Sequence, residues 1–522
     1  MKFNSFVSSV IAFSCFSAGV WAQDAPQLWH LSAPSTSVSG INLDEAKKLI
    51  EGKKATPVIV AVIDGGTETS HSEIAPRLWI NTDEIADNGI DDDRNGYIDD
   101  IHGWNFIGGK TDDVVHDNLE FTRIYKELKQ KYEGKQASDI APAQLEEFRK
   151  YERFAKEYEQ RLTEATEEQM GFEQFMAVYK LADMTVKKTL GKQEYTLEDV
   201  QGMEGEDDFT VAIKEILTYA LTEDIVSQID EIKSHFSDQF EYSYNLNFDP
   251  RSVVGDNYND PTERYYGNNR CYAPKADHGT HVSGIIGALN DGKGAEGICK
   301  DALIMPIRCV PNGDERDKDV ANAIRYATDN GARIINMSFG KSYSPHKTVV
   351  DEAIKYAESK GVLMIHAAGN DSKNVDVSAN FPTPFYDGGG KCSTWITVGA
   401  SSHFLEELAA DFTNYGKKKV DVFAPGVNIY STYPTNSHKK ESGTSMAAPV
   451  TSGVAAFILS YYPELSAKQL KAIIEKSVVK YKVKVPMPGN PEKKVKFNSL
   501  SKTGGVINLS KALTLAEKTT AK

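Results

Sequence analysis

Short apolar runs occur near residue 60 and again over the second half of the chain, where they alternate with segments of helical periodicity. The β-branched run Pro57–Ile63 stops at Asp64-Gly65-Gly66, which is typical of a strand buried on both faces of a parallel sheet. Helical segments at 320–330 and 349–360 each precede another such run. The further runs are found at 332–337, 362–368, 395–400 and 420–424. This alternation predicts an α/β fold, a parallel sheet with helices on both faces.

A charged segment, residues 108–250, interrupts this pattern. It is rich in Glu, Lys and Gln, and its apolar residues recur at helical spacing, which predicts amphipathic helices with charged outer faces. One predicted face consists of Leu145, Phe148, Ala155, Tyr158 and Leu162. One or two further helices would use Leu197, Phe209, Ile213, Ile216, Leu217 and Ala220. We therefore expect a sheet domain formed by 23–107 and 251–512, a mostly α-helical insertion at 108–250, and a short tail at 513–522.

The first 22 residues match the pattern of an export signal. Lys2 precedes the apolar stretch Phe6–Val20, and Val20-Trp21-Ala22 supplies small residues for cleavage. A buried N-terminal helix is the alternative. No other stretch approaches the ~20 apolar residues that span a bilayer. We expect a mature protein without a membrane span, secreted or periplasmic.

Composition narrows the class of protein. The chain has 74 acidic and 59 basic residues, a net charge of −15, and 40% of its residues are hydrophobic. A globular protein with a sizeable core fits these values, whereas a nucleic-acid binder would need a basic surface. Four cysteines follow the predicted cleavage point and allow three disulfide pairings or four free thiols: Cys271, Cys299, Cys309 and Cys392.

Four polar residues stand at the ends of strands or the starts of helices. Asp64 and Asn370 end strands, while His278 and Ser445 begin apolar helices. Taken singly, each has a structural interpretation, such as a turn residue or a helix N-cap. In parallel sheets, however, functional groups gather beyond the carboxyl ends of the strands, and all four residues are expected there.

The segments around these residues resemble the subtilases, the subtilisin-like serine peptidases. The resemblance covers about 55–107 and 270–480 and includes Asp277-His278-Gly279-Thr280-His281 and Gly443-Thr444-Ser445-Met446-Ala447-Ala448-Pro449. It implies an endopeptidase acting on polypeptides, with Ser445 as nucleophile, His278 as base and Asp64 as its orienting carboxylate. Asn370 would donate to the oxyanion together with the Ser445 N–H. His281 would be structural.

The same resemblance implies where the substrate binds. Ser338-Phe339-Gly340 matches the family's strand beside the specificity pocket, with Phe339 in place of the usual Leu. An extended substrate would pair with this backbone by strand addition. Ala368 and Gly369, in the segment before Asn370, are expected to contact it as well. Asp371 would favour basic side chains.

A calcium site is predicted in the segment 91–100. This segment contains D-x-D-x-N-G, the first half of a calcium loop, but His102 stands where a regular loop has Glu. Asp100 or a distant carboxylate would have to complete the shell, and an acidic turn is the alternative. The predicted ligands are Asp91, Asp93, Asn95, the Tyr97 carbonyl and Asp99.

The chain departs from the family at two places. Only some thirty residues separate Ala22 from the first strand, which is too few for the usual pro-domain, and the insertion lengthens the Asp64–His278 connection. The insertion is expected to restrict access to the cleft or to be a peripheral decoration. A catalytically silent binding protein and a peptide ligase are the alternative functions. For a histidine base, activity should fall as pH drops through about 6–7.

Overall fold

The computed structural model describes residues 26–35, 38–222, 225–272, 276–290, 292 and 294–521. The predicted export signal lies outside the described residues. The chain divides into two compact units, a helical unit of Phe121–Phe248 and a sheet unit that reaches Glu120 and resumes at Asp249. The helical unit therefore begins at Phe121 and not at residue 108.

The sheet unit is built on seven parallel strands in the order β2-β3-β1-β4-β5-β6-β7. The central strand β1 (Val58–Asp64) ends at Asp64, opposite Arg308 of β3. The other strands are β2 (Trp104–Asn105), β3 (Ala302–Arg308), β4 (Ile334–Met337), β5 (Leu363–Ala367), β6 (Trp395–Ser401) and β7 (Val422–Pro425). The predicted parallel α/β sheet is confirmed.

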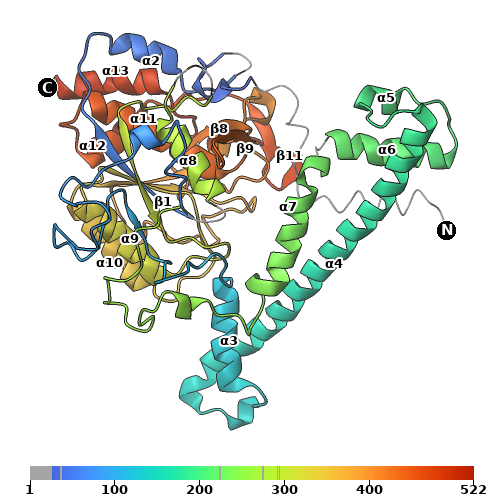
Figure 1. The fold of residues 1–522 in the computed structure, drawn as a ribbon, viewed down its shortest axis with the longest axis horizontal. Helices are drawn as coiled ribbons and strands as arrows, with labels where there is room; N and C mark the ends of the chain where they lie inside the picture. Colours follow the sequence, from blue (N-terminus) through green and yellow to red (C-terminus); the bar gives the residue numbers. More distant parts are fainter. Residues whose placement is uncertain are drawn as a thin grey trace. The chain divides into compact units, whose positions relative to one another are not determined.

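Two pairs of helices cover the sheet. α8 (Asp277–Gly287) packs against α11 (Thr444–Tyr461), and α9 (Asp317–Asp329) packs against α10 (Lys347–Ser359) on the other face (Figure 1). Nearly every residue of α11 is buried, because the helix lies against β4 to β7 on one side and against α8 and the C-terminal helices on the other. Its apolar composition on all sides is typical of such a central helix.

Shorter elements complete the sheet unit. The outer helices are α2 (Leu43–Leu49), α12 (Ala467–Lys476) and α13 (Leu509–Thr520). Two antiparallel hairpins join β8 (Ile429–Tyr433) to β9 (Ser437–Glu441) and β10 (Lys484–Met487) to β11 (Asn490–Lys496). No helix in the described part of the chain is long and apolar enough to cross a membrane.

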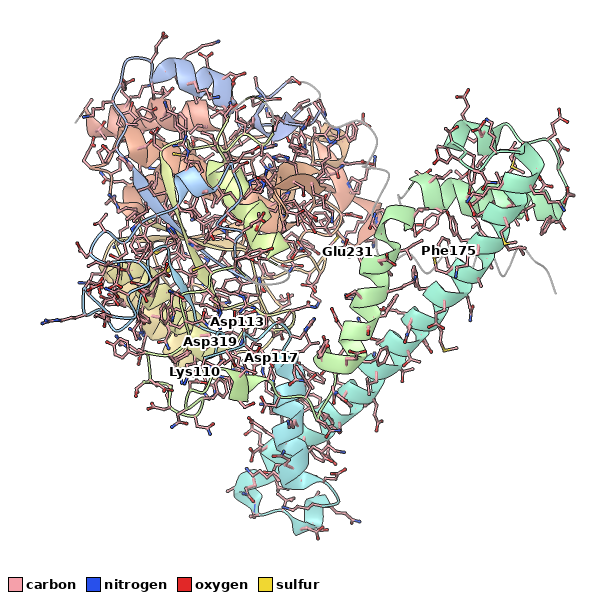
Figure 2. The ribbon with its side chains drawn as sticks, in the orientation of Figure 1. Lys110, Asp113, Asp117, Phe175, Glu231 and Asp319 are labelled. Atoms are coloured by element: carbon pink, nitrogen blue, oxygen red, sulfur yellow. The ribbon has the colours of Figure 1, made fainter. Side chains whose placement is uncertain are left out.

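The helical unit is organised around one long helix, α4 (Leu145–Leu190). Its first half stacks aromatic rings against α3 (Glu120–Tyr132), as in the pair Phe121–Phe154. Its second half, which includes Phe175, shares an apolar cluster with the other helices (Figure 2). These are α5 (Leu197–Gln201), α6 (Asp208–Thr222) and α7 (Ile225–Asp238). The helical unit thus has its own core.

Candidate active site

Asp64 and His278 are hydrogen-bonded at the end of the central strand. His278 is the second residue of α8, and its Nδ1 lies 2.8 Å from Asp64 Oδ1 and 3.0 Å from Oδ2. The start of α8 can approach β1 this closely because residue 279 is glycine. A Cβ at Gly279 would lie 2.1 Å from the Gly66 carbonyl oxygen. Since a carboxylate only accepts, Nδ1 carries the proton and Nε2 is left as the basic nitrogen.

The carboxylate also changes the acidity of the imidazole. Burial by itself lowers the pKa of His278, but the charge and the hydrogen bond of Asp64 outweigh burial and raise the pKa from 6.5 to about 9. The imidazole side chain is 40% exposed, whereas Asp64 is almost fully buried. His278 is therefore open to a substrate, while its partner is held inside the sheet.

His281 occupies a different environment one turn further along α8. Its side chain is fully buried, its Nε2 lies 3.1 Å from the Lys439 carbonyl oxygen, and burial lowers its pKa to about 3. A neutral, enclosed imidazole of this kind supports the structural role expected for it.

Ser445 lies in the first turn of α11, where it is joined to the end of β4. The Ser445 hydroxyl donates to the Ser338 carbonyl oxygen at 3.0 Å, and the Ser338 hydroxyl donates to the Ser445 carbonyl oxygen at 2.9 Å. The second bond is available because residue 449, the usual helical donor to this carbonyl, is proline. No hydrogen bond joins Ser445 to His278 among the described residues. Rotation about the Cα–Cβ bond would redirect the hydroxyl without moving the helix.

The side-chain amide of Asn370 has a fixed orientation beside Ser445. Its Oδ1 accepts from both the backbone N–H and the hydroxyl of Thr444, each at 2.9 Å, so Nδ2 is the outward donor. A Cβ built on Gly443 would lie 3.4 Å from Asn370 Nδ2 and 3.5 Å from the Ser445 backbone nitrogen. Two N–H donors therefore converge on one small space next to Gly443.

The expected substrate segments continue β4 and β5 beyond their last paired residues, so an unpaired gap separates the two segments. Ser338-Phe339-Gly340 continues β4 past its last paired residue, and Ala368-Gly369 continues β5. Asn380 bridges them, because its Nδ2 donates to the Ala368 carbonyl at 2.9 Å and its Oδ1 would lie 2.7 Å from a Cβ on Gly340. The Phe339 ring packs on the main core and edge-on to His366.

Three side chains hold this region together, and sequence reasoning missed two of them, Asn380 and Asn414. Asn414 donates to the Ala368 carbonyl and accepts from the backbone N–H groups of Asp371 and Lys373. Asn380 spans the gap, and the Thr444 hydroxyl accepts from the Gly369 N–H. The partners of Asn380 and Asn414 lie outside their own segments, so no local pattern distinguishes these two from ordinary loop residues. Asp371 itself is more than half exposed.

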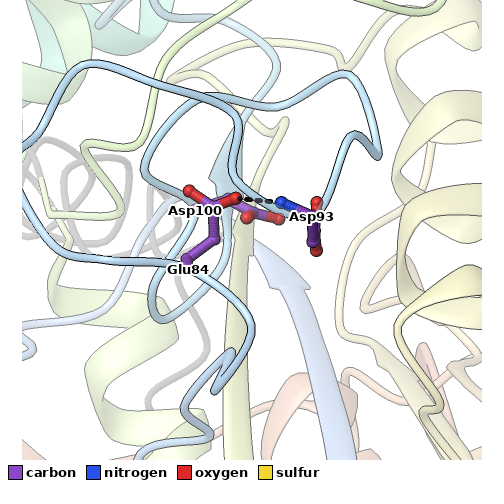
Figure 3. A group of neighbouring side chains, drawn as sticks. All are labelled: Glu84, Asp93 and Asp100. Carbon is purple, nitrogen blue, oxygen red and sulfur yellow. Dashed lines mark hydrogen bonds between the residues drawn. The ribbon is translucent and has the colours of Figure 1, made fainter.

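The acidic loop brings together a different set of carboxylates from the one expected. One oxygen from each of Glu84, Asp93 and Asp100 lies within 4.8 Å of the others (Figure 3). Glu84 also accepts from the backbone N–H of Asp93, the bond dashed in Figure 3. Of the predicted ligands, only Asp93 belongs to this group, and the other side chains are hydrogen-bonded inside the loop: Asp91, Asn95 and Asp99. Oxygen donors at this spacing fit a hard divalent cation.

The four cysteines in the described part of the chain are free thiols in the structure. Cys271, Cys299, Cys309 and Cys392 are all buried, and burial raises the pKa of each thiol. Between the two alternatives left by the sequence, the structure contains the free thiols.

The site combines a carboxylate bound to an imidazole with a serine at a helix N-terminus beside converging N–H donors. Serine hydrolases use this set of groups. Comparison with known proteins gives the family. The sequence profile described as the Subtilase family matches residues 55–504. The chain belongs to the subtilase family and is a serine-type endopeptidase, which acts on polypeptides.

Named relatives match part of the chain. Subtilisin DY of Bacillus licheniformis is 35% identical over 196 residues, which are 37% of this chain and 67% of that protein. Thermitase of Thermoactinomyces vulgaris is 37% identical over 205 residues, which are 39% of this chain and 67% of that protein. A thermophilic serine proteinase of Bacillus sp. (strain AK1) is 39% identical over 186 residues, which are 35% of this chain and 43% of that protein. A solved protease of Pseudoalteromonas arctica PAMC 21717 aligns over 94% of this chain and 97% of its own, at 19% identity and a TM-score of 0.47.

Proposed function

We propose that the chain is an exported endopeptidase that hydrolyses polypeptides through an acyl-enzyme on Ser445. The observation that carries this proposal is that three features lie at the carboxyl ends of the neighbouring strands β1, β4 and β5. They are the Asp64–His278 hydrogen bond, the Ser445 hydroxyl bonded to Ser338, and the two N–H donors beside Gly443. Each belongs to a different segment of the chain, and each meets a separate chemical requirement of acyl transfer.

The geometry supports a specific division of labour. His278 Nε2 takes the proton of the Ser445 hydroxyl as the oxygen attacks the peptide carbonyl, and Asp64 stabilises the resulting imidazolium. The oxyanion receives hydrogen bonds from Asn370 Nδ2 and the Ser445 backbone N–H, at the N-terminal end of α11 where the helix dipole favours negative charge. His278 then protonates the leaving amine, and water releases the acyl group by the same steps.

The proposed substrate pairs with the segment Ser338–Gly340 as an added strand. This segment extends beyond the last residue at which β4 pairs with its neighbours, and Gly340 is exposed. Ala368 and Gly369 form the opposite wall. Because Asn380 closes the gap between the walls, we propose that it limits the size of the substrate side chain admitted there.

Calcium binding belongs to the same proposal. The three carboxylates of Glu84, Asp93 and Asp100 would hold the cation, which would neutralise their mutual repulsion and stabilise the loop. The amide groups of Asn81 and Asn95 donate to both Asp93 and Asp100, and this convergence of donors on two neighbouring carboxylates supports the proposal. Export rests on the sequence pattern of residues 1–22, and N-terminal sequencing of protein recovered from outside the cytoplasm tests it.

A fluorophosphonate probe tests the proposed chemistry directly. The probe should label the signal-free protein at Ser445, and Ser445→Ala should abolish labelling, because the probe forms its bond with an activated serine oxygen. Hydrolysis of a denatured protein substrate should disappear in the same variant. An unlabelled, folded wild-type protein would reject the peptidase in favour of a silent scaffold.

A further inference from the structure

A buried lysine directly follows the proposed substrate segment. Lys341 comes after Gly340, and its backbone N–H and carbonyl both bond to Phe381 at 2.9 Å. Phe381 in turn follows Asn380, which reaches the opposite wall at Ala368. The backbone of Lys341 therefore fixes how the strand 338–340 is placed relative to the segment that bridges the gap.

The side chain of Lys341 ends in an acidic enclosure. Its ammonium lies 2.7 Å from Glu120 Oε2, 2.8 Å from Asp317 Oδ1 and 2.6 Å from the Glu315 carbonyl oxygen. The side chains of Lys341, Glu120 and Asp317 are each no more than 3% exposed. An ammonium has three donors, so these three oxygens satisfy it fully.

The partners of Lys341 come from two distant elements. Asp317 is the first residue of α9, and Glu120 is the first residue of α3, with its backbone N–H held by Asp314. A buried charge loses far more when it is moved than an exposed one, because no water replaces its partners. The enclosure therefore resists any displacement of residue 341, and with it any displacement of the strand before it.

We propose that Lys341 is a positioning residue that holds Ser338-Phe339-Gly340 in the geometry that an extended peptide needs. Glu120, the partner in this ion pair, is the last residue of the sheet unit before the helical unit begins. The inference rests on the proposed function, because it assigns a role in binding the same substrate. Lys341 does not touch the reacting atoms and acts only through the backbone of its neighbours.

The test separates substrate positioning from the chemistry of the serine. Lys341→Met keeps an unbranched side chain that is one heavy atom shorter and removes its charge. We expect kcat/KM for an extended peptide to fall roughly tenfold to a hundredfold, the scale of a displacement near 1 Å. A small fluorophosphonate needs no strand pairing, so its rate of labelling should stay within about twofold of the wild-type rate. A twofold change is well below the roughly tenfold loss expected from mispositioning of the peptide. The full-length protein is used, and its unfolding temperature is recorded beside the rates.

Lys318 provides the matched control. Its ammonium also has three close acceptors, Asp256, the Asn257 carbonyl and Glu263, and its side chain is only 3% exposed, but it does not adjoin the substrate segment. Lys318→Met should lower stability and leave the ratio of the two rates unchanged. If Lys318→Met lowers the ratio of peptide kcat/KM to the labelling rate as much as Lys341→Met does, the loss follows from general destabilisation of the protein. The proposal is then wrong.

Glu120→Gln keeps the test decisive if Lys341→Met does not fold. This variant removes the negative charge of one partner but keeps an amide oxygen that can accept from the ammonium, so it should reduce peptide kcat/KM in the same direction by a smaller factor. Equal loss of both rates, or no loss of either, overturns the role of Lys341. Failure of the wild-type protein to react with the probe would instead overturn the proposed function, so the two failures are distinguishable.

Discussion

Ser338 and Ser445 exchange hydrogen bonds in both directions, hydroxyl to carbonyl each way. The pair joins the strand that is proposed to receive the substrate to the helix that carries the proposed nucleophile. Pro449 makes the arrangement possible, since it leaves the Ser445 carbonyl without a helical donor. A proline inside a buried helix, which would normally cost stability, here frees an acceptor for another element.

Replacing Ser338 by alanine should loosen this junction. The change removes the hydroxyl that serves the Ser445 carbonyl, and the loss of one such bond is worth about 1 kcal/mol of unfolding free energy. We also expect slower fluorophosphonate labelling, because the first turn of α11 is less well held. Urea denaturation and labelling kinetics measure the two effects. Thr451→Ala, which removes a buried α11 hydroxyl bonded within its own helix, should slow labelling much less; equal slowing in both variants would contradict the specific role.

Gly443→Ala should produce a stable protein with low turnover. The backbone of Gly443 is extended, with φ of 163°, and an added Cβ meets neighbours at ordinary contact distances, so the fold tolerates it. The methyl group would occupy the space onto which Asn370 Nδ2 and the Ser445 N–H converge. We expect kcat to fall by roughly the 10²–10³ that loss of one oxyanion donor costs in a subtilisin, with unfolding temperature unchanged or slightly raised.

Asn370→Leu is the companion variant, and its kcat should fall by a similar factor. Combining the two changes should cost little more than either alone, because both remove the same stabilisation of the oxyanion. Fully additive losses would show that Gly443 acts elsewhere. Steady-state kinetics on one peptide substrate measure all three proteins.

The pH dependence of activity should lie above the range expected for an ordinary histidine. Asp64 raises the pKa of His278 from 6.5 to about 9, and only the neutral imidazole can accept the serine proton. Because a raised pKa keeps the base protonated to higher pH, kcat/KM should rise with pH through a midpoint above 6.5. The pH–rate profile of the free enzyme measures this midpoint. A profile that stays flat from pH 8 down to 5 would contradict the assignment of His278.

Asp64→Asn should move that midpoint downward and lower the rate. The neutral amide no longer stabilises the imidazolium, so the pKa of His278 falls toward its usual value. The amide also permits the wrong tautomer, for which kcat falls by roughly 10⁴ in a related triad. An unshifted midpoint would mean that another group controls the titration.

Removal of calcium should lower the unfolding temperature of the sheet unit. A cation bound at Glu84, Asp93 and Asp100 stabilises the folded state by about 2.7 kcal/mol when its free concentration is 100 times Kd. Thermal unfolding with calcium and with excess EDTA measures the difference, in the Ser445→Ala background to prevent self-digestion. An identical curve in both conditions would contradict the site.

Two substitutions distinguish the possible ligand sets. Glu84→Gln should abolish the difference between calcium and EDTA if the carboxylates that the structure brings together bind the ion. Asp91→Asn should abolish it if the loop binds through the oxygens expected from the D-x-D-x-N-G pattern. Each variant is compared with itself in the two conditions, so a change in its own stability does not affect the result.

The sheet was largely predictable because its strands carry their own signal. β-branched runs such as Val58–Ile63 end abruptly at polar residues, and every strand predicted from such a run is present. β3 was not predicted, because Pro306 interrupts its apolar run and lacks the N–H that an inner strand normally uses. The two-residue strand β2 is too short to leave a pattern.

The edges of the insertion were harder to predict, since the sequence around 108–120 is polar. In the structure this stretch belongs to the sheet unit, where Val114 is buried in the main core and its carbonyl accepts from Arg308. Within the helical unit, Ile213, Ile216 and Leu217 are buried as the spacing predicts, but Phe209 is 48% exposed. Periodicity identifies a helix face, whereas burial at a helix end depends on contacts that sequence does not specify.

Side chains that act over long range left no signal at all. Asn380 and Asn414 hold the substrate walls through bonds to Ala368, 12 and 46 residues away. Lys341 finds Glu120 across 221 residues. Each is a common polar residue, and only the folded chain shows that its partner is buried and that its position matters.

Deletion of the helical insertion tests whether it controls access to the cleft. The two ends of the insertion are anchored at one guanidinium, because Arg316 binds Asp117 at 2.7 Å and Asp249 at 3.4 Å. A short Gly/Ser linker can therefore replace residues 125–245 while it preserves Glu120 and its bond to Lys341. We propose that the insertion restricts substrates, and we expect the shortened enzyme to cleave folded or bulky proteins faster while its rate on a short peptide stays the same. Unchanged rates on both would show a peripheral decoration, and Lys341→Met in the shortened enzyme should still impair the peptide reaction.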